Sequence, residues 1–524
     1  MANQLSYKPL DNIGINGLNT QANPTTLDPS WLTKADNIVL RESGRISFRK
    51  GLKQKILAND FGTSSAPLKI GAIAEVGSTT LAAIGTNMYT VDFTSPDTPW
   101  TSAGLSGITD SDWQMIPFRG EMYCVQSNHI PVEYDAGTWT TLTSASGYSG
   151  PTGVTTFNPR CGTGYYGRLW VGGISEEKDV VYYSDTLDGH KWHSGTAGVI
   201  DLKTVWGTDE IIAIAPFYGK LVIFGKNNIA IYNNPSDPTN MALDEVIRGV
   251  GCVSRDSVQA VGDDLLFLSN TGLRSLLRTT EKDKLPLTDL SVNIKDTLIR
   301  NIAQSSNVKA TYVENEGIYM MSFVDLNITY VFDMKHITPV QAPRVTTWSF
   351  DADREPSCLA YTESKGFLVG QKKGSIATYE GYFDKDYSGS AVHTSHSYTG
   401  SFGTTWIDLG DSVVASLLKK MKAIINGGAG TNIGVKWYKD FSQIPSKTQS
   451  FQLNPTSTGD VALFGNSTSL WGDVKYTPVY GLKEYNIPLT GSAKHLQIEM
   501  AAETNGYVAS LQDMTLLYKQ GKIR

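Results

Sequence analysis

Two close pairs of histidines are the residues of this chain whose spacing comes nearest to a metal site. His190 and His193 flank Trp192, and His393 and His396 stand three positions apart in a serine-rich passage. A structural zinc ion takes four ligands, and neither pair has a cysteine or an acidic third ligand that completes a set. We therefore expect no metal centre and no cofactor.

The cysteines also give no indication of a metal site. Each of the four occurs singly in a strand-like context, without a CxxC pair, at Cys124, Cys161, Cys252 and Cys358. This spacing indicates neither a zinc site nor a disulfide framework. We expect small buried apolar residues, which fits folding in a reducing cytosol.

Neighbouring carboxylates could catalyse glycoside hydrolysis, which requires two carboxyl groups at defined positions. The candidates are Asp209 with Glu210, Asp263 with Asp264, and Glu314 with Glu316. All of them sit at predicted turns, where acidic residues are ordinary. The sequence also has no nucleotide-binding, zinc-protease or serine-hydrolase motif in a suitable context. We therefore expect no catalytic residues and predict that the chain is not an enzyme.

Residues 184–192 resemble the Asp-box hairpin of sialidase-type propellers. In that hairpin a serine and an aspartate, here Ser184 and Asp185, bind the turn backbone, and a tryptophan, here Trp192, packs between strands. The box is a folding element, and it occurs once here where those glycosidases generally carry several. A structural role is therefore expected for it.

The element that must position these residues is a repeat of an apolar strand, a Gly- or Asp-centred turn, and two further strands. Its copies start at Ile70, Asp112, Arg160, Ile211, Asp256, Val308 and Pro356, about 42 to 52 residues apart. That period is typical of propeller blades. The turns at 217–220, 261–264 and 314–317 supply the residues that a positive φ requires. The sequence predicts an all-β fold with a six- or seven-bladed β-propeller, because terminal units often complete one blade jointly.

One helix is predicted beside the blades, from residue 289 onward. Its apolar positions recur at helical spacing, at Leu290, Ile294, Leu298, Ile299 and Ile302. Asp289 or Ser291 is the expected N-cap.

The pattern changes near residue 395, where strands alternate with longer polar loops. Leu496, Ile498 and Met500 alternate with polar residues, which predicts a strand with one buried face. Ahead of the blades, strand-like residues on both sides of Ser43 and Gly44 predict a hairpin. We expect an N-terminal arm and hairpin over residues 1–55, the propeller over 56–394 and a β-sandwich-like domain over 395–524, with a long loop at 448–485.

Charge excludes one class of function. The formal net charge is −6 and the pI is near 5.7, which argues against a surface that grips nucleic acid by neutralising phosphates. No apolar run approaches the roughly 20 residues that span a bilayer, so neither a membrane anchor nor a secretion signal is expected.

Several phrases, in their order along the chain, resemble those of the tail-nozzle, or packaged-DNA-stabilising, family of short-tailed bacteriophages. The first is the N-terminal phrase around Asn37, Arg45, Arg49 and Gly51. The others are the central phrases at 167–173, 180–192, 219–232 and 249–276, and the C-terminal phrase at 419–440.

The resemblance implies a structural virion protein of the phage tail, assembled in the host bacterial cytoplasm. It implies a homo-oligomer, a ring of six copies below the portal and adaptor, beside a fibre, tail tip or plug. This nozzle would line the DNA exit channel, retain packaged double-stranded DNA, and pass it without sequence preference. Asn37, Arg45, Arg49 and Gly51 are its candidate assembly contacts.

The alternative is a carbohydrate-binding or glycosidase propeller that acts on host surface glycans. Its stacking platforms would be Trp100, Trp113, Trp139 and Trp192, although propeller tryptophans more often lock blades together. Oligomeric state separates the two hypotheses, because a nozzle must assemble whereas a lectin or hydrolase works as a monomer. A cytosolic scaffold is a third hypothesis, but the chain lacks recurring WD or kelch signatures.

Overall fold

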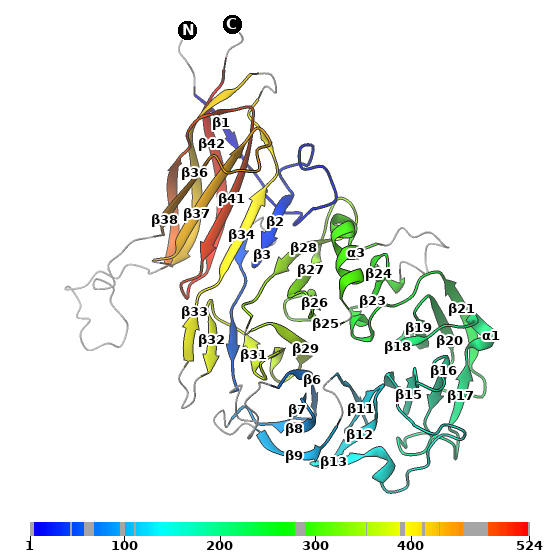
Figure 1. The fold of residues 1–524 in the computed structure, drawn as a ribbon. Helices are drawn as coiled ribbons and strands as arrows, with labels where there is room; N and C mark the ends of the chain where they lie inside the picture. The colour runs from blue at the N-terminus through cyan, green and yellow to red at the C-terminus, as the bar shows by residue number, and fades with distance from the viewer. Residues whose placement is uncertain are drawn as a thin grey trace, which may run out of the picture.

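The computed structural model is built almost entirely from β-strands (Figure 1). It describes residues 5–41, 45–56, 68–94, 100–108, 112–277, 289–305, 307–352, 354–387, 393–410, 414–428, 430–453 and 480–521. Small sheets form a ring, and a pair of packed sheets stands beside it. This arrangement confirms the predicted all-β propeller with a C-terminal sandwich.

Four blades are antiparallel sheets of four consecutive strands. They are β6 (Ile70–Val76), β7 (Thr79–Ile84), β8 (Asn87–Val91) and β9 (Trp100–Ser106); β10 (Gln114–Phe118), β11 (Glu121–Gln126), β12 (His129–Asp135) and β13 (Thr138–Thr141); β14 (Cys161–Tyr165), β15 (Arg168–Gly172), β16 (Val180–Tyr183) and β17 (Gly198–Asp201); β18 (Ile211–Phe217), β19 (Lys220–Gly225), β20 (Asn228–Asn233) and β21 (Ala242–Arg248). Between β18 and β19, Tyr218 and Gly219 have φ of 45° and 77°. The predicted positive-φ turn at 217–220 is thus confirmed.

The next two units differ from these four. Within the described residues, the fifth blade consists of β22 (Gln259–Val261), β23 (Asp264–Ser269) and β24 (Gly272–Ser275). The sixth unit is made of β25 (Val308–Val313), β26 (Ile318–Phe323), β27 (Ile328–Ile337) and β28 (Pro343–Trp348). Its last strand pairs with β2 (Leu32–Asp36), so this unit continues into a ten-stranded sheet that reaches the sandwich.

The last blade closes the ring with a strand from the start of the chain. It contains β29 (Pro356–Thr362), β30 (Gly366–Gln371) and β31 (Ile376–Tyr379), and its fourth strand is β5 (Leu52–Gln54). The hairpin of β32 (Asp384–Tyr387) and β33 (His393–His396) extends it, and β29 contacts β6 of the first blade. The ring therefore has six separate sheets plus the sector β25–β28, and these match the seven predicted repeat units in order.

The sandwich packs a seven-stranded sheet against the far part of the ten-stranded sheet. The first contains β1 (Ser6–Pro9), β3 (Ile38–Leu40), β4 (Ile46–Phe48), β36 (Ser416–Gly428), β39 (Tyr480–Pro488), β40 (Ser492–Ala493) and β42 (Ala509–Lys519). The second contains β2, β34 (Thr399–Thr404), β35 (Ile407–Asp408), β37 (Asn432–Lys439), β38 (Lys447–Gln452) and β41 (His495–Glu503). Leu496, Ile498 and Met500 are buried as predicted. Most of the expected loop at 448–485, residues 454–479, lies outside the described residues.

Residues 1–55, expected as a separate arm, are instead divided between the two domains. β1, β3 and β4 join the sandwich, and β5 joins the last blade. The predicted hairpin exists, with Ile38 opposite Phe48, although its turn at Ser43 and Gly44 lies outside the described residues. The correction has a simple physical reason: β1, β4 and β5 pair with strands hundreds of residues away, and local pattern carries no information about such pairing.

The predicted helix is confirmed as α3 (Lys295–Gln304), preceded by a 3₁₀ turn, η3 (Val292–Ile294). Leu298 and Ile302 are buried. The N-cap position of α3 itself is Ile294, whereas Ser291, one of the two predicted N-caps, is the N-cap position of η3. Neither residue makes a side-chain capping bond. Asp289 instead accepts hydrogen bonds from the backbone and hydroxyl of Ser291. Another short helix, α1 (Lys203–Trp206), follows β17.

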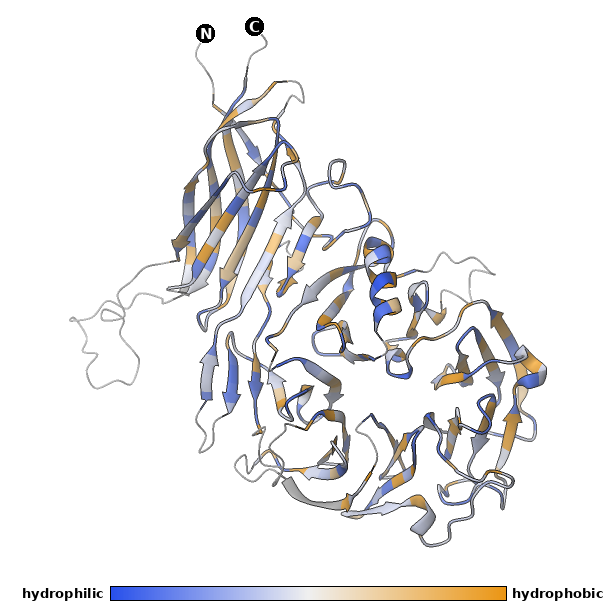
Figure 2. Cartoon of the chain, in the orientation of Figure 1, coloured by the Kyte–Doolittle hydropathy of each residue, from blue (hydrophilic) through white to orange (hydrophobic). Residues whose placement is uncertain are grey.

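Hydrophobic residues alternate with polar ones along the sandwich strands, whereas inner blade strands are apolar over longer runs (Figure 2). One cluster of buried residues runs from the fifth blade through β25–β28 into the sandwich, for example from Leu268 through Phe332 to Trp437. A shared core and a shared sheet therefore join the propeller to the sandwich.

Candidate functional site at the propeller–sandwich junction

Arg49 lies between β4 and β5, where the chain leaves the sandwich and enters the last blade. Its side chain is 0% exposed and pairs with Asp384 at 3.3 Å. The guanidinium carbon lies 3.9 Å from the ring centroid of Tyr398 and 4.8 Å from that of Phe350. The Tyr398 hydroxyl donates to the Arg49 carbonyl. Propeller and sandwich residues therefore enclose one cation, which is stabilised by charge pairing and by aromatic faces.

Asn37 holds the other side of this guanidinium. Its Oδ1 accepts a hydrogen bond from Arg49 Nε at 2.9 Å, and its Nδ2 donates to the Thr399 carbonyl at 3.0 Å. The backbone of Asn37 is left-handed, with φ of 54°, a conformation that asparagine tolerates better than most residues. The side chain thus links the N-terminal segment to both neighbours.

Gly51 is needed because another backbone segment passes close to it, and not because of a positive φ angle. A Cβ atom at this position would lie 1.8 Å from the carbonyl oxygen of Phe383. The amide of Gly51 donates to the Gly381 carbonyl at 2.9 Å, and its carbonyl accepts from Glu380. The Arg-Lys-Gly phrase is therefore where β5, the fourth strand of the last blade, meets the hairpin of β32 and β33.

Asn37, Arg49 and Gly51 are expected to be assembly contacts, and in the single chain all three are buried among residues of the same chain. Arg45 is exposed at the end of the hairpin, and its role as an assembly contact stays a prediction. The sequence phrase marks a junction inside the molecule.

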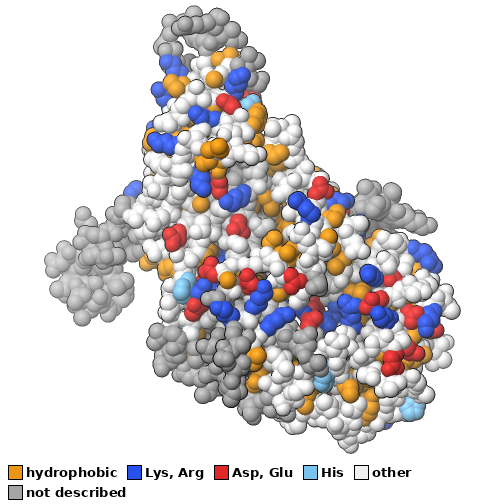
Figure 3. Space-filling model, viewed as in Figure 1, with side chains coloured by type: hydrophobic (Ala, Val, Ile, Leu, Met, Phe, Trp, Pro, Cys, Tyr) orange, Lys and Arg blue, Asp and Glu red, His pale blue; other side chains and the backbone are white. Residues whose placement is uncertain are grey.

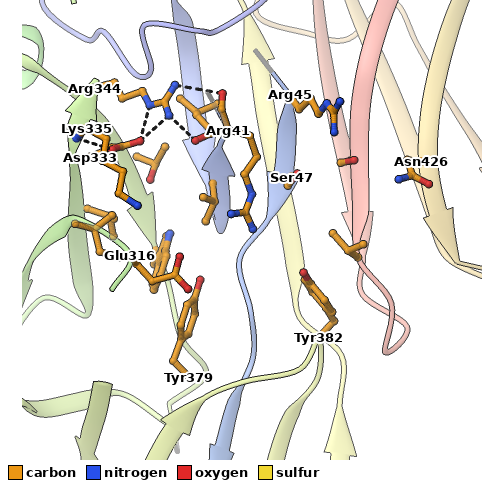
Figure 4. A pocket seen from close by; sticks show the side chains of 18 residues that line it. Arg41, Arg45, Ser47, Glu316, Asp333, Lys335, Arg344, Tyr379, Tyr382 and Asn426 are labelled. Atoms are coloured by element: carbon orange, nitrogen blue, oxygen red, sulfur yellow. Dashed lines mark hydrogen bonds and ion pairs between the residues drawn. The ribbon is translucent and has the colours of Figure 1, made fainter. Parts of the chain in front are cut away.

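A cavity of about 570 Å³ opens beside this junction. We call it the junction cavity; one wall is the sandwich sheet at β3, β4, β36 and β42, and the other is formed by β26–β28 and β31. The charged residues on its lining are Arg41, Arg45, Glu316, Asp333, Lys335 and Arg344 (Figure 4). Arg344 is 2% exposed, pairs with Asp333 at 2.6 Å, and donates to the Leu40 carbonyl at 2.7 Å. This arginine therefore fixes the two walls relative to each other.

A second charged cluster links blades near the middle of the ring. This hub network consists of Asp112, Arg255, Asp256 and Lys309, which come from the second, fifth and sixth units. Lys309 Nζ contacts Asp112 and lies 2.6 Å from Asp256, and Arg255 Nε lies 2.9 Å from Asp256. Arg255 also donates to the Arg160 carbonyl of the third blade at 2.7 Å. The network connects blades across the axis.

Charge pairing sets the protonation of this network. Burial alone would raise the pKa of Asp256, but Arg255 and Lys309 hold that pKa well below its usual range. Burial likewise opposes the charge on Lys309, yet Asp256 and Asp112 raise its pKa. All four residues are therefore charged at neutral pH. Acidic and basic side chains are also intermingled over the middle of the propeller in the space-filling view (Figure 3).

The predicted carboxylate pairs occupy turns and ion pairs. Asp209 accepts hydrogen bonds from Asn227 and Asn228 at 2.8 to 3.2 Å. Glu210 pairs with Arg160 at 2.8 Å, and Glu316 pairs with Lys50 at 2.7 Å. Glu316 lies in a turn, as expected, whereas Asp209 is buried.

The histidine pairs do not converge. His190 lies 2.8 Å from Glu133, and His193 lies 2.8 Å from the Ser149 hydroxyl. His396 lies 3.0 Å from Asp386, and the Nδ1 of His393 is buried. Within the described ranges, no three His, Cys, Asp or Glu residues are grouped so that they could hold a metal ion.

The Asp-box segment has the expected structural geometry. Asp185 Oδ1 accepts from the Thr196 amide at 2.9 Å and from its hydroxyl at 2.6 Å. Trp192 is buried, with its ring centroid 4.9 Å from that of Phe157. Trp113 and Trp139 are buried as well, which contradicts their expected use as exposed stacking platforms; the side chain of Trp100 lies outside the described part.

All four cysteines are free and buried, as predicted. Burial raises the pKa of the Cys252 thiol to about 11 and those of Cys161 and Cys358 to about 12. The pKa of Cys124 is also raised by burial. These thiols therefore stay protonated at neutral pH.

Comparisons with known proteins place the chain in no family. No family model matches the chain, and no curated protein matches it. Among solved structures, it is similar to the extracellular domain of a hybrid two-component system from B. thetaiotaomicron, at 11% identity and a TM-score of 0.41, over 64% of this chain and 40% of the other. It is also similar to PorZ, a surface component of the type-IX secretion system of Porphyromonas gingivalis, at 14% identity and a TM-score of 0.37, over 74% and 45%.

The chain thus spans less than half the length of these two proteins. A third similar structure is an auxiliary nutrient binding protein from Bacteroides thetaiotaomicron, at 12% identity and a TM-score of 0.33, over 60% of this chain and 69% of the other. Among the described residues, no helix is both long and apolar enough to cross a membrane.

Proposed function

We propose that this chain is a structural protein of the tail of a short-tailed bacteriophage, a nozzle subunit that lines the DNA exit channel. In this role it retains packaged DNA and passes it, without sequence preference, during ejection. The proposal places it in the virion tail, after assembly in the host cytoplasm, as a ring of six copies beside the adaptor, portal and other tail proteins. It is not an enzyme under this proposal.

The observation that carries the proposal is the rigid junction at Arg49. A ten-stranded sheet shared by both domains, a buried ion pair with Asp384 and a strand donated by the N-terminal segment make the propeller and sandwich one body. Such a body suits a mechanical task in a tail under DNA pressure. The order of the family-like sequence phrases supports the same role, and the net charge of −6 fits a channel through which DNA slides.

The oligomeric state of the purified full chain tests the proposal. Light scattering and negative-stain microscopy should find rings of six, alone or with the adaptor, and antibodies should label the tail of the virion. The carbohydrate hypothesis is less favoured because Trp113, Trp139 and Trp192 are buried. A chain that stays monomeric, is missing from virions, and binds or cleaves a glycan would overturn the proposal.

A further inference from the structure

The junction cavity carries an excess of positive charge. Its two carboxylates are already neutralised, since Asp333 pairs with Arg344 at 2.6 Å and Glu316 pairs with Lys50 at 2.7 Å. The cavity is also lined by Arg41, Arg45 and Lys335, which form no ion pair within the part of the chain that the structure describes. A cavity with several cations of this kind attracts anions.

The sandwich wall adds a row of neutral polar side chains. Ser47 on β4 stands opposite Ser510 on β42, and Ser510 stands opposite Asn426 on β36. Residues paired across neighbouring strands project from the same face of a sheet, so these three side chains form one row. Their neighbours along the strands, such as Ile46, enter the sandwich core. The row lines the cavity and provides hydrogen-bond donors near the cations.

The shape of the cavity selects a small ligand. A volume of about 570 Å³ lies within the range of small-molecule sites. Arg344 and the shared sheet hold the two walls in place, so the spacing between the walls is set before anything binds. A DNA duplex is too wide to enter such a space.

We propose that the junction cavity binds a small multivalent phosphate anion, such as a polyphosphate or the phosphate chain of a nucleotide. Arginine offers a planar fork of donors that matches phosphate oxygens, and lysine adds a point charge. Arg41, Arg45 and Lys335 would contact the phosphates, while the Ser47, Ser510 and Asn426 row would receive the remaining oxygens. This site is separate from the proposed passage of DNA.

Isothermal titration calorimetry of the full chain with inorganic tripolyphosphate tests the proposal. We expect saturable binding of one anion per chain, weaker at high salt because screening reduces the attraction. The double variant Arg41→Gln, Arg45→Gln should weaken the affinity at least tenfold, and Lys335→Gln should weaken it as well. The control Arg300→Gln removes a cation from the exposed side of α3 and should bind like the unmodified chain.

Three results would overturn the inference. The first is no saturable binding of tripolyphosphate or of a nucleoside triphosphate at 0.15 M salt. The second is unchanged affinity in the double variant while circular dichroism shows an intact fold. The third is tighter binding of a short DNA duplex that depends on the same three cations, which would make this surface a DNA contact instead.

Discussion

Arg49 and Asp384 are 335 positions apart in the sequence, yet they form a fully buried ion pair where the propeller meets the sandwich. Removing one partner of such a pair leaves an uncompensated charge in the interior. The variant Arg49→Met is therefore expected to lower the free energy of unfolding by about 3 to 5 kcal/mol, as measured by urea denaturation.

The exposed pair of Lys34 with Glu499 provides the control for this change. Lys34→Met removes a cation whose side chain is 48% exposed, and the expected loss is below about 1 kcal/mol. Equal losses in the two variants would show that the Arg49 pair has no special role at the junction.

Gly51 gives a second test of how the ring closes. The variant Gly51→Ala places a Cβ 1.8 Å from the carbonyl oxygen of Phe383, so the backbone must move away from its neighbour. We expect β5 to loosen from β31, with faster proteolysis near residue 55 and a lower melting temperature. Gly434→Ala on β37 is the matched control, because the nearest atom to its new Cβ is 3.8 Å away. A Gly51 variant as protease-resistant as the control would argue against this closure.

The fold could be predicted from the sequence to the extent that local pattern determines it. The seven repeat starts coincide with the inner strands because turn glycines and apolar runs are local signals. The apolar spacing at Leu298 and Ile302 predicts the helix, but the spacing does not predict the 3₁₀ turn between Ser291 and the start of α3.

Neither the junction at Arg49 nor the hub network can be predicted from local sequence pattern. Sequence alone favours a surface position for Arg49, since arginine is seldom fully buried. Asp384, Asn37 and three aromatic rings together make its burial tolerable. Lys309 and Asp112 are 197 positions apart, and neither belongs to a motif. Pairings of this kind follow from ring closure and have no signature along the chain.

The buried thiols yield a simple chemical prediction. A protonated thiol is a poor nucleophile, and burial raises the pKa of Cys161, Cys252 and Cys358 to about 11 or 12. With Ellman's reagent at pH 8, the folded chain should show almost no reaction, and the chain in urea should show all four thiols. Rapid labelling of the folded chain would mean that a blade opens readily.

The hub network predicts how stability depends on pH. Because Arg255 and Lys309 hold the folded pKa of Asp256 below its usual 3.8, its contribution is complete above about pH 4 and is lost as the pH falls through the folded pKa. The raised pKa of Lys309 works in the opposite sense, since its contribution is complete below pH 10.5 and is lost only above that value. The free energy of unfolding should therefore fall in acid below pH 4 and again in strong base.

The variant Asp256→Asn separates this effect from general acid denaturation. At pH 7 it should cost about 3 kcal/mol, because the buried cations of Lys309 and Arg255 lose a charged partner. At pH 2.5 the cost should shrink, since this pH lies below the usual pKa of 3.8, so the carboxyl is largely protonated in the unfolded chain while the folded chain keeps it ionised. The exposed Asp135 supplies the control Asp135→Asn, for which urea denaturation should give the same small difference at both pH values. If Asp256→Asn cost the same free energy of unfolding at pH 7 and at pH 2.5, the two cations would not hold the carboxylate ionised. The blades would then be connected across the propeller axis by packing and not by charge.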